Sequence, residues 1–295
     1  MRQTRVLVFG AHGMLGQALV RRFAQDAACV LLTAARRDAD FCLDMTDDAA
    51  LAATFSTARP DVVINAAAVT NLAAAERDPG LAYCVNARFA GVLAELCRAA
   101  GARLVQVSTD HYYTGDGAAL HDENAPVRLL NEYARTKYAG EAFARAYDGS
   151  LVLRTNIVGF RYQSGHPTFV EWALGELQAG RPMRLFDDFY TSSMTVRQLA
   201  DVIAAALGQG LTGLYNVAAR HAVTKEQFVV ALSDAFFGRP PVYERASVHG
   251  MPSPVQRADS LGLDTRRIEA ALGIRMPELP DVIASLKEEW NEHAV

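Results

Sequence analysis

Short apolar runs alternate with longer helical patterns over the first 155 residues, and this alternation constrains the fold more than any other feature of the chain. The predicted strands are Arg5–Gly10, Cys29–Ala34, Phe41–Leu43, Asp61–Ala68, Ala102–Thr109 and Ser150–Thr155, and the predicted helices are Met14–Asp26, Asp47–Thr57, Leu81–Ala100 and Glu132–Tyr147. Continuous apolar strands indicate a parallel sheet that is covered on both faces. Right-handed crossovers between such strands give an α/β fold of the doubly wound, Rossmann type.

The pattern becomes less regular after about Asn156. The predicted helices there are Pro167–Ala179, Val196–Leu207, Lys225–Phe236, Asp264–Leu272 and Pro280–Glu292, with capping boxes at Thr195…Gln198 and Thr224…Gln227 and short strands at Met183–Phe186 and Leu214–Asn216. The stretch FFGRPPVYERASVHGMPSPVQRADS is rich in proline, glycine and serine and is predicted to be a loop. We therefore expect a doubly wound domain over residues 1–155 and a smaller, mainly helical domain over 156–295, with an approximate boundary that the chain can cross back.

Composition narrows the class of protein. Of 295 residues, 51% are hydrophobic and 21% are charged, which suits a globular chain with a sizeable core. A net charge of −4 predicts no general attraction to nucleic acid or to an anionic membrane. The four cysteines lack a CxxC spacing and are predicted to be reduced thiols of a cytoplasmic protein. The first apolar run is too short for a signal peptide, and none is long enough to span a bilayer.

A glycine-rich turn follows the first predicted strand, in the sequence FGAHGMLGQ. Gly10 permits a tight turn, Gly13 lets a pyrophosphate approach the backbone, and Gly16 lets the helix pack closely on the strand. The free N–H groups and the dipole of the helix that follows favour a bound anion. The position of this turn between a strand and a helix favours a dinucleotide site over a ligand-free glycine turn.

The end of the second predicted strand indicates which dinucleotide binds. Arg36 and Arg37 stand where NAD-specific sites carry an acid, and an arginine suits the 2′-phosphate of NADP. The sequence therefore favours NADP(H) over NAD(H), although both arginines could also be solvated. Asp44 could accept a hydrogen bond from the adenine amino group, or it could cap a helix, since Thr46 and Asp47 follow.

A tyrosine and a lysine lie four residues apart in NEYARTKYAGE. Tyr133 and Lys137 share a face of the predicted helix, whereas Tyr138 lies about 100° away and is expected to be a packing residue. A lysine ammonium near a tyrosine favours the phenolate, so the pair could transfer a proton to or from a carbonyl oxygen. On spacing alone, an exposed pair on an ordinary helix is the simpler interpretation.

The end of the fifth predicted strand, VQVSTDHYYTG, adds hydroxyl groups to this arrangement. Ser108 and Thr109 end the strand and Asp110 begins the loop, at the carboxyl edge where open α/β sheets bind ligands. A hydroxyl there could donate a hydrogen bond to a substrate oxygen while Tyr133 transfers the proton. The glycine turn, the strand-end hydroxyl, the tyrosine and the lysine together are far more specific than any one of them.

With these motifs the chain resembles the extended short-chain dehydrogenase/reductases, and within them the dTDP-4-dehydrorhamnose reductase group of nucleotide-sugar 4-ketoreductases. The matching segments are GAHGMLGQALV, LDMTD, RPDVVINAAAVT, AERDPGLAYCVNA, GARLVQVSTD, NEYARTKYAGE, LVLRT and QLADVI, which span about two thirds of the chain in the family's order. The resemblance implies an NAD(P)-binding Rossmann domain, a C-terminal substrate-binding domain and a nucleotide-sugar substrate. It also implies a possible homodimer built on the two long helices.

The resemblance implies a role for each matching residue. Tyr133 would be the general acid, Lys137 would lower its pKa and bind the nicotinamide ribose, and Thr109 matches the active hydroxyl. Asn86 matches the asparagine of the VNA segment, with a purely structural hydrogen bond as the alternative. The implied cofactor residues are Gly10, His12, Gly13, Met14, Leu15, Gly16, Arg36, Asp44, Met45, Ala66, Ala67, Ala68 and Lys137, and the implied substrate residues are Val69, Thr70, Ser108, Thr109, Asp110, Tyr133 and Asn156. No metal is required.

Departures from the family pattern gather where the sugar would bind. Ala73 replaces an aspartate, and Asn156 and Ile157 stand where a serine and an aromatic residue are usual. His111 replaces the glutamate of related dehydratases, which disfavours dehydration, and as a lone loop histidine it is expected to face solvent. The candidate contacts for the substrate diphosphate, each of which could instead be an ordinary surface charge, are Arg154, Arg161, Arg184 and Arg197.

The sequence predicts NAD(P)H-dependent reduction of the 4-keto group of a nucleotide-activated deoxysugar. Two alternatives remain open. One is an NADP-binding regulatory subunit of another enzyme, since regulatory members of this fold can keep the same residues. The other is a nucleotide-sugar 4-epimerase, which would hold NAD tightly and show no net cofactor turnover.

Overall fold

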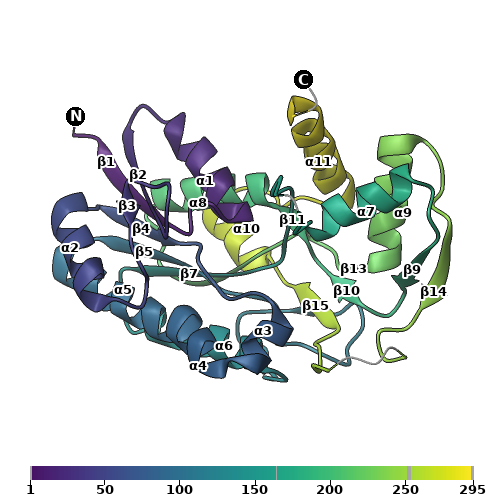
Figure 1. The fold of residues 1–295 in the computed structure, drawn as a ribbon, viewed down its shortest axis with the longest axis horizontal. Coiled ribbons are helices and arrows are strands. Elements are labelled where there is room, and N and C mark those ends of the chain that lie inside the picture. Colours follow the sequence, from purple (N-terminus) through teal and green to yellow (C-terminus); the bar gives the residue numbers. More distant parts are fainter. Residues whose placement is uncertain (1, 164, 251–253, 294–295) are drawn as a thin grey trace. The chain divides into compact units, whose positions relative to one another are not determined.

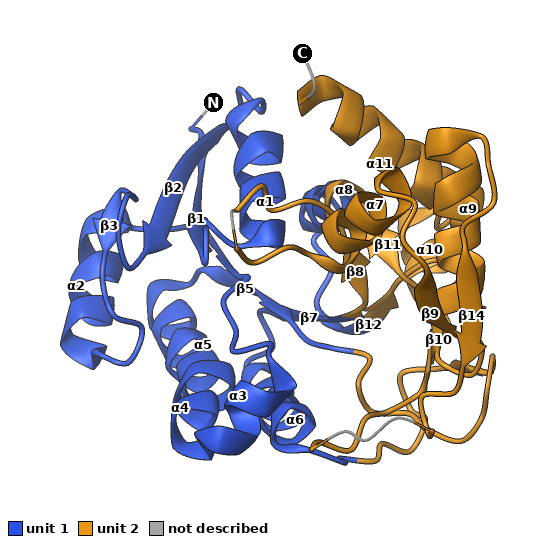
Figure 2. Ribbon diagram, turned by 45° about the vertical axis from the view of Figure 1, so that its right-hand side comes forward, with its two compact units in different colours: residues 1–109, 129–154, 200–215 blue, residues 110–128, 155–199, 216–295 orange. Residues whose placement is uncertain are grey.

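The computed structural model describes residues 2–163, 165–250 and 254–293. The chain forms two compact units, drawn in two colours in Figure 2. Unit 1 contains residues 1–109, 129–154 and 200–215, and unit 2 contains residues 110–128, 155–199 and 216–295. The division expected after residue 155 therefore differs from the observed one at two segments. Residues 110–128 leave unit 1 directly after its fifth strand, and residues 200–215 return to it with most of a helix and the start of a strand.

Unit 1 is built on a seven-stranded sheet in the order β12-β7-β5-β4-β1-β2-β3. The edge strand β12, the last of these strands in the sequence, continues into unit 2. The strands are β1 (Thr4–Phe9), β2 (Cys29–Ala35), β3 (Phe41–Cys42), β4 (Val62–Asn65), β5 (Arg103–Val107), β7 (Ser150–Thr155) and β12 (Gly213–Val217). All pairings from β3 to β7 are parallel. The predicted doubly wound parallel sheet is thus confirmed, and β12, expected only as a short strand, extends its edge.

Helices cover both faces of this sheet. Figure 1 shows α1 (Met14–Ala24) and α8 (Val196–Gly208) on one face, and α2 (Asp48–Ala58), α5 (Phe89–Ala100) and α6 (Glu132–Arg145) on the other. An ion pair from Arg22 to Asp201, 3.0 Å long, joins α1 to α8. The core on the second face consists of apolar side chains from strands and helices, including Leu7, Phe9, Leu51, Phe55, Val63, Phe89, Leu93 and Leu104.

The long helix predicted over Leu81–Ala100 is not one regular helix. The structure has α4 (Pro79–Tyr83), a π-helical segment η1 (Cys84–Arg88) and then α5. The start lies earlier because Pro79 occupies the first turn and the Asp78 side chain accepts a hydrogen bond from the Leu81 N–H. A further helix, α3 (Leu72–Arg77), lies in a segment that was not predicted to be helical.

Unit 2 combines short sheets with helices. Its strands pair in the orders β13-β10-β15-β6, β11-β8 and β14-β9. Their bounds are β6 (Leu120–His121), β8 (Ile157–Val158), β9 (Met183–Phe186), β10 (Tyr190–Thr191), β11 (Met194–Thr195), β13 (Val223–Thr224), β14 (Tyr243–Ala246) and β15 (Ser260–Leu263), and the helices are α7 (Phe169–Gln178), α9 (Lys225–Phe237), α10 (Arg266–Leu272) and α11 (Leu279–His293). The long stretch predicted as a loop contains β14, which pairs in parallel with β9, and its residues 251–253 lie outside the described residues.

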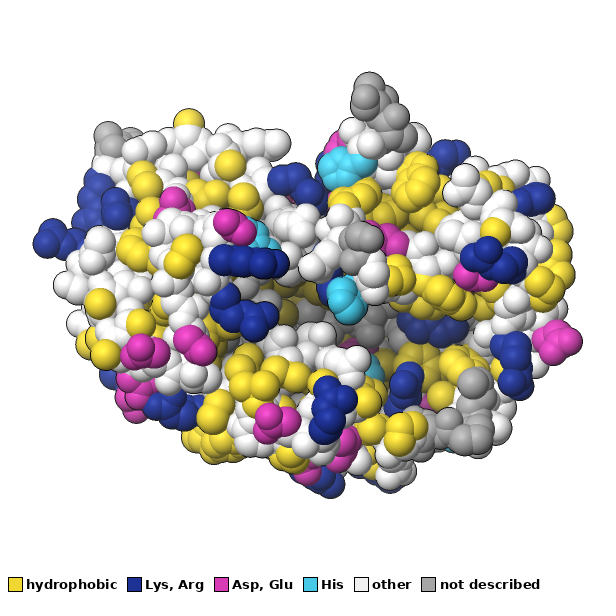
Figure 3. All heavy atoms as spheres, viewed as in Figure 1, with side chains coloured by type: hydrophobic (Ala, Val, Ile, Leu, Met, Phe, Trp, Pro, Cys, Tyr) yellow, Lys and Arg dark blue, Asp and Glu magenta, His cyan; other side chains and the backbone are white. Residues whose placement is uncertain are grey.

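Two helices after residue 155, α8 and α9, begin with the predicted capping boxes. Thr195 and Gln198 exchange hydrogen bonds of 3.0 and 3.1 Å between side chain and backbone, and Thr224 and Gln227 do the same at 2.8 and 3.0 Å. Both capping boxes are therefore confirmed. Basic and acidic side chains are interspersed over the face drawn in Figure 3. In the described parts of the chain, none of the helices combines the length and apolarity needed to cross a membrane.

Candidate active site

The turn between β1 and α1 is shaped by its glycines. Gly10 has φ of +79°, and a Cβ there would lie 2.8 Å from the Ala67 backbone nitrogen at the end of β4. A Cβ on Gly16 would lie only 2.0 Å from the Gly10 carbonyl oxygen. Gly13 is the N-cap of α1 and provides no side chain to bond the first free N–H groups. A cradle of bare backbone at a helix N-terminus therefore suits a dinucleotide pyrophosphate.

The other implied cofactor residues of this region lie around the ends of β2 and β3. The exposed His12 ring makes a 2.9 Å hydrogen bond with the Arg37 carbonyl, and Arg36 and Arg37 are both exposed. Asp44 accepts hydrogen bonds from the N–H and hydroxyl of Thr46, which hold the pKa of its carboxyl below the ordinary value, and the nearby charge of Arg36 acts in the same direction. The cap of the next helix is Asp47 rather than Asp44.

The segment after β4 is held by a buried amide. Asn86 in η1 accepts from the Val69 N–H at 2.8 Å and donates to the Val69 carbonyl at 3.0 Å and to the Thr136 hydroxyl at 3.1 Å. The structural alternative for Asn86 is therefore the one observed. Its hydrogen bonds tie the implied substrate residue Val69 to α6, while the next residue, Thr70, is exposed.

Tyr133 and Lys137 both lie on α6, which begins where the Asn131 side chain accepts a hydrogen bond from the Ala134 N–H. Tyr133 is 9% exposed and packs on Ala75 and Ala82. Lys137 is 4% exposed, and its ammonium donates to the Val107 carbonyl at 2.7 Å. Desolvation lowers the pKa of Lys137 to about 8, while the negative charge of Glu141 acts in the opposite direction.

This burial bears on the choice between the two tyrosines. A surface pair would leave Tyr133 and Lys137 in solvent, whereas both are buried and Tyr138 is half-buried. Thr109, which is 3% exposed, lies two residues after Val107, the residue that holds the lysine. Unit 1 therefore brings the predicted acid, its lysine and the strand-end hydroxyl to one region at the carboxyl end of β5.

Ser108 has a partner that sequence reasoning missed. Its hydroxyl donates to Glu141 at 3.0 Å, and Glu141 also accepts hydrogen bonds of 3.0 and 2.6 Å from the guanidinium of Arg154. Arg154 is 3% exposed and Glu141 is 1% exposed. Arg154 is thus neither a surface charge nor open to a diphosphate, which corrects one of the predicted anion contacts. The sequence signal for this partner was the position of Glu141, which lies one helical turn after Lys137 on the same helix face.

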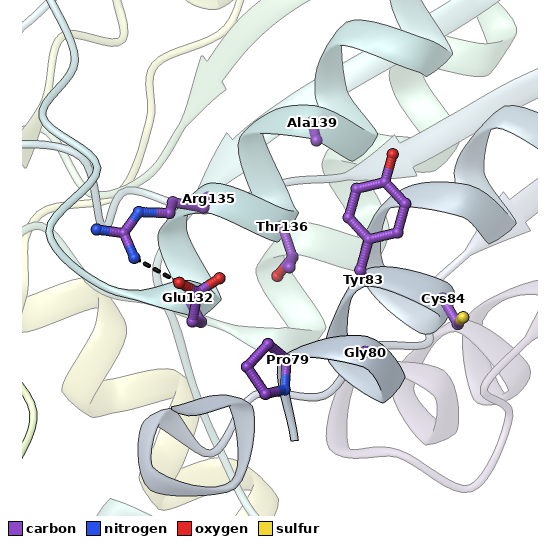
Figure 4. Close-up of a pocket in the computed structure, with 8 residues that line it drawn as sticks. All are labelled: Pro79, Gly80, Tyr83, Cys84, Glu132, Arg135, Thr136 and Ala139. Atoms are coloured by element: carbon purple, nitrogen blue, oxygen red, sulfur yellow. Dashed lines mark hydrogen bonds and ion pairs between the residues drawn. The ribbon is translucent and has the colours of Figure 1, made fainter. Parts of the chain in front are cut away.

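A hollow on the surface of unit 1 lies beside this region without including it. Figure 4 shows side chains from α4, η1 and α6 around it, among them Tyr83, Glu132 and Thr136. The Thr136 hydroxyl donates to the Tyr133 carbonyl and accepts from the Asn86 amide. Neither Tyr133 nor Lys137 lines the hollow.

Two implied substrate residues of unit 2 contact each other. The Asn156 amide donates to the Asp110 carboxylate at 2.6 Å, and the Asn156 carbonyl accepts from the Ser193 hydroxyl. Asp110 is 1% exposed, so its carboxylate is fixed by Asn156 and is not an open loop group. Asn156, placed where the family usually has serine, therefore links β10 and β11 to the residue that follows Thr109.

Unit 2 also brings basic groups to this segment. Burial lowers the pKa of His111 to about 4, and the positive charges of Lys225 and Arg257 act in the same direction. His111 is half-buried, which corrects the expectation of a solvent-facing histidine. The sequence had marked Lys225 only as the residue after a helix cap.

The Lys225 ammonium lies over aromatic rings. It is 4.4 Å from the centre of the Phe169 ring and 5.7 Å from that of Phe189. Desolvation lowers its pKa to about 8, against the negative charge of Asp110. Among the described residues, none accepts a hydrogen bond from this ammonium. Two of the predicted anion contacts have other surroundings. Arg197 forms an ion pair with Glu292, and the Arg184 side chain on β9 is exposed.

Comparison with known proteins identifies the family of this chain. Residues 4–290 match the family described as "RmlD substrate binding domain". The chain is 36% identical over 221 residues to dTDP-4-dehydrorhamnose reductase of Streptomyces griseus, covering 74% of this chain and 70% of that one. It is 27% identical over 295 residues to the probable low-salt glycan biosynthesis reductase Agl14 of Haloferax volcanii, covering 97% and 98%.

Solved structures share the fold. The dTDP-4-dehydrorhamnose reductase of Bacillus anthracis in complex with NADP has a TM-score of 0.86 at 23% identity, covering 97% of this chain and 99% of that one. The UDP-glucose 4-epimerase of Thermus thermophilus in complex with NAD has a TM-score of 0.77 at 22% identity, covering 96% and 99%. The resemblance drawn from the motifs is confirmed, and the chain belongs to the RmlD substrate binding domain family.

Proposed function

We propose that this protein catalyses the NAD(P)H-dependent reduction of the 4-keto group of a nucleotide-activated deoxysugar. The observation that carries the proposal is the burial of Tyr133 and Lys137 on one face of α6, with the lysine bonded to the Val107 carbonyl beside Thr109. Relatives named dTDP-4-dehydrorhamnose reductase support the same chemistry. The free thiols of the four cysteines support a reducing, cytoplasmic location.

The residues divide the work of the reaction. A bound nicotinamide would supply the hydride, and the turn at Gly10, Gly13 and Gly16 would hold its pyrophosphate. Tyr133 donates a proton from its hydroxyl to the ketone oxygen as that oxygen gains negative charge. Lys137 stabilises the resulting phenolate with its positive charge, and the Thr109 hydroxyl donates a hydrogen bond to the same substrate oxygen.

We infer a preference for NADP(H) over NAD(H). The exposed guanidinium groups of Arg36 and Arg37 follow β2, where a 2′-phosphate would need positive charge. The positive charge of Arg36 helps to lower the pKa of Asp44, so these two residues are near each other. We infer that Arg36 and Asp44 flank the adenosine. The NADP complex of the Bacillus anthracis relative is compatible with this assignment.

We infer that Lys225 contacts an oxyanion of the substrate. Its ammonium is held over Phe169 by a cation–π contact, and none of the described residues accepts a hydrogen bond from it. A nucleotide diphosphate supplies acceptors of the matching charge.

NADPH oxidation with a panel of 4-keto-6-deoxy nucleotide-sugars tests the proposed function. We expect turnover on at least one member, with NADPH preferred over NADH. Bound cofactor without consumption on any member would reject the reductase and favour a regulatory subunit. Interconversion of epimers without net consumption would identify an epimerase.

A further inference from the structure

A buried ion pair lies on α6 one helical turn after Lys137. Glu141 accepts hydrogen bonds from Nε and Nη2 of Arg154, at 3.0 and 2.6 Å, and from the Ser108 hydroxyl at 3.0 Å. Glu141 comes from α6, Arg154 from β7 and Ser108 from the residue that follows β5, and all three are 5% exposed or less. Both oxygens of the carboxylate and two donors of the guanidinium are therefore engaged inside unit 1.

Stability alone is a weak reason for such a pair. Removing two charges from water costs several kcal/mol, and apolar residues of similar volume often replace a buried pair without loss. The position of Glu141 in the helix suggests another reason. Tyr133, Lys137 and Glu141 are spaced four residues apart, so they follow one another along a single face.

The same face is joined to the end of β5 at two consecutive residues. Lys137 donates to the Val107 carbonyl, and Ser108 donates to Glu141. Thr109 is the next residue of the chain. These two hydrogen bonds, one helical turn apart, fix the distance between the strand that carries the hydroxyl and the helix that carries the acid.

Glu141 is also the charge that acts on the catalytic lysine. Burial lowers the pKa of Lys137 to about 8, and Glu141 raises it. The charged groups on the other elements that pack against α6 are all exposed or half-buried, and Arg154 is paired with Glu141 itself. Those groups are Glu76 and Arg77 on α3, Asp78 at the start of α4, Arg88 in η1, Glu95 and Arg98 on α5, and Arg103 on β5.

We propose that Glu141 is a positioning residue of the reductase, which Arg154 holds in place and which acts through Ser108 on the end of β5 and through its charge on Lys137. The inference rests on the proposed function, because it assigns Glu141 to the support of Tyr133 and Lys137. Ser108 is then a structural link and not a substrate contact.

The charge effect can be measured without any enzyme assay. Lys137, Lys225 and Lys287 are the only lysines of the chain, so ¹³C-labelled lysine gives three side-chain signals to follow in a pH titration by NMR. Lys137→Arg, which lacks one signal, assigns the resonance. We expect Glu141→Gln to lower the pKa of Lys137 by about one unit, because the negative charge is lost. Glu95→Gln on the exposed face of α5 is the control and leaves that titration unchanged.

The kinetic effect follows from the same shift. At pH 8 the protonated fraction of Lys137 would fall from about one half in the wild type to about one tenth in Glu141→Gln, so kcat at that pH falls about fivefold. At pH 6 the lysine is protonated in both proteins, and kcat of the variant returns to about the wild-type value. Glu141→Asp keeps the charge and restores the pH profile in part. Ser108→Ala lowers kcat without moving the Lys137 titration, which separates the link to β5 from the charge.

Opposite results would overturn the inference. An unchanged Lys137 titration in Glu141→Gln, together with an unchanged kcat of the folded fraction, would leave Glu141 a purely structural residue. A wild-type protein that shows the expected titration but reduces no nucleotide-sugar would instead reject the proposed function. If Glu141→Gln does not fold, Glu141→Asp and Ser108→Ala decide, and a wild-type kcat at pH 8 in both variants would also overturn the inference.

Discussion

For single residues, burial separates the proposed acid–base pair, Tyr133 and Lys137, from an ordinary surface pair. Lys137 gives up hydration and receives one hydrogen bond acceptor, the Val107 carbonyl, so its ammonium keeps donors for other partners. Desolvation lowers the pKa of Lys137 to about 8, and below that pH its ammonium carries the positive charge that would stabilise a Tyr133 phenolate. Spacing had identified the pair, but only the packing of α6 against β5 explains why it can work.

Tyr133→Phe tests the proton donor. We expect turnover to fall about 10²- to 10⁴-fold, because the phenol is the acid, while the affinity for NADPH remains nearly unchanged. Stopped-assay turnover and equilibrium binding of NADPH provide the two readings. Tyr138→Phe, five positions further along the same helix, is the matched control. The reverse pattern would mean that the face of α6 has been misassigned.

Lys225→Met tests the proposed oxyanion contact. Hydrogen bonds to charged groups contribute about 1.5–3 kcal/mol, so we expect KM for the nucleotide-sugar to rise about tenfold or more with a smaller change in kcat. Lys225→Arg keeps the charge and should lie in between. Lys287→Met removes an exposed lysine and serves as the control. An unchanged KM in Lys225→Met would remove this residue from the substrate contacts.

At the scale of elements, local signals were predictable and paired ones were not. Both capping boxes act within three residues, so the starts of α8 and α9 follow from neighbouring side chains, whereas the caps at Asn71 and Asp78 were not recognised. The strand β14 depends on β9, some sixty residues earlier in the chain, and its prolines and glycines concealed it. The π-helical turn η1 likewise interrupts a sequence with good helical periodicity, and no local residue type marks it.

Gly16→Ala tests the turn between β1 and α1. The new Cβ would lie 2.0 Å from the Gly10 carbonyl, so the backbone must shift, and we expect NADPH binding to be lost and thermal stability to fall. Gly175→Ala in α7 adds the same methyl where nothing lies within 4 Å, and helix propensity favours alanine there by about 1 kcal/mol. Calorimetry with and without NADPH reads both variants. Normal cofactor binding in Gly16→Ala would argue against this cradle.

At the scale of the whole molecule, the chain alternates between its units. The passage of the chain from unit 1 to unit 2 after Arg154 was predictable, because the strand–helix alternation becomes less regular there. The assignment of residues 110–128 to unit 2 and of residues 200–215 to unit 1 was not predictable. Nothing local indicates that β12 continues the sheet of unit 1, because strand order depends on long-range pairing. For the same reason Arg154 resembled a surface arginine until β7 and α6 were placed together in one unit.

Cofactor preference is also a property of the whole protein, because a ligand of the native state raises its stability. At 100 times its Kd, NADPH should add about 2.7 kcal/mol to the free energy of unfolding. We expect a smaller gain from NADH at equal concentration. Replacing Arg36 and Arg37 by Ser should remove the difference without affecting stability in the absence of ligand. A thermal shift series checks this, and equal gains from both cofactors in the wild type would contradict it.

In the proposed reaction, hydride passes to C4 of a nucleotide-sugar while Tyr133 supplies the proton. The most direct measurement is the mass of the product formed from NADPH deuterated at the transferring position. We expect one deuterium in the sugar, at C4, with one cofactor oxidised for each product. Deuterium-free product, or no product from any 4-keto sugar while NADPH remains bound, would contradict it.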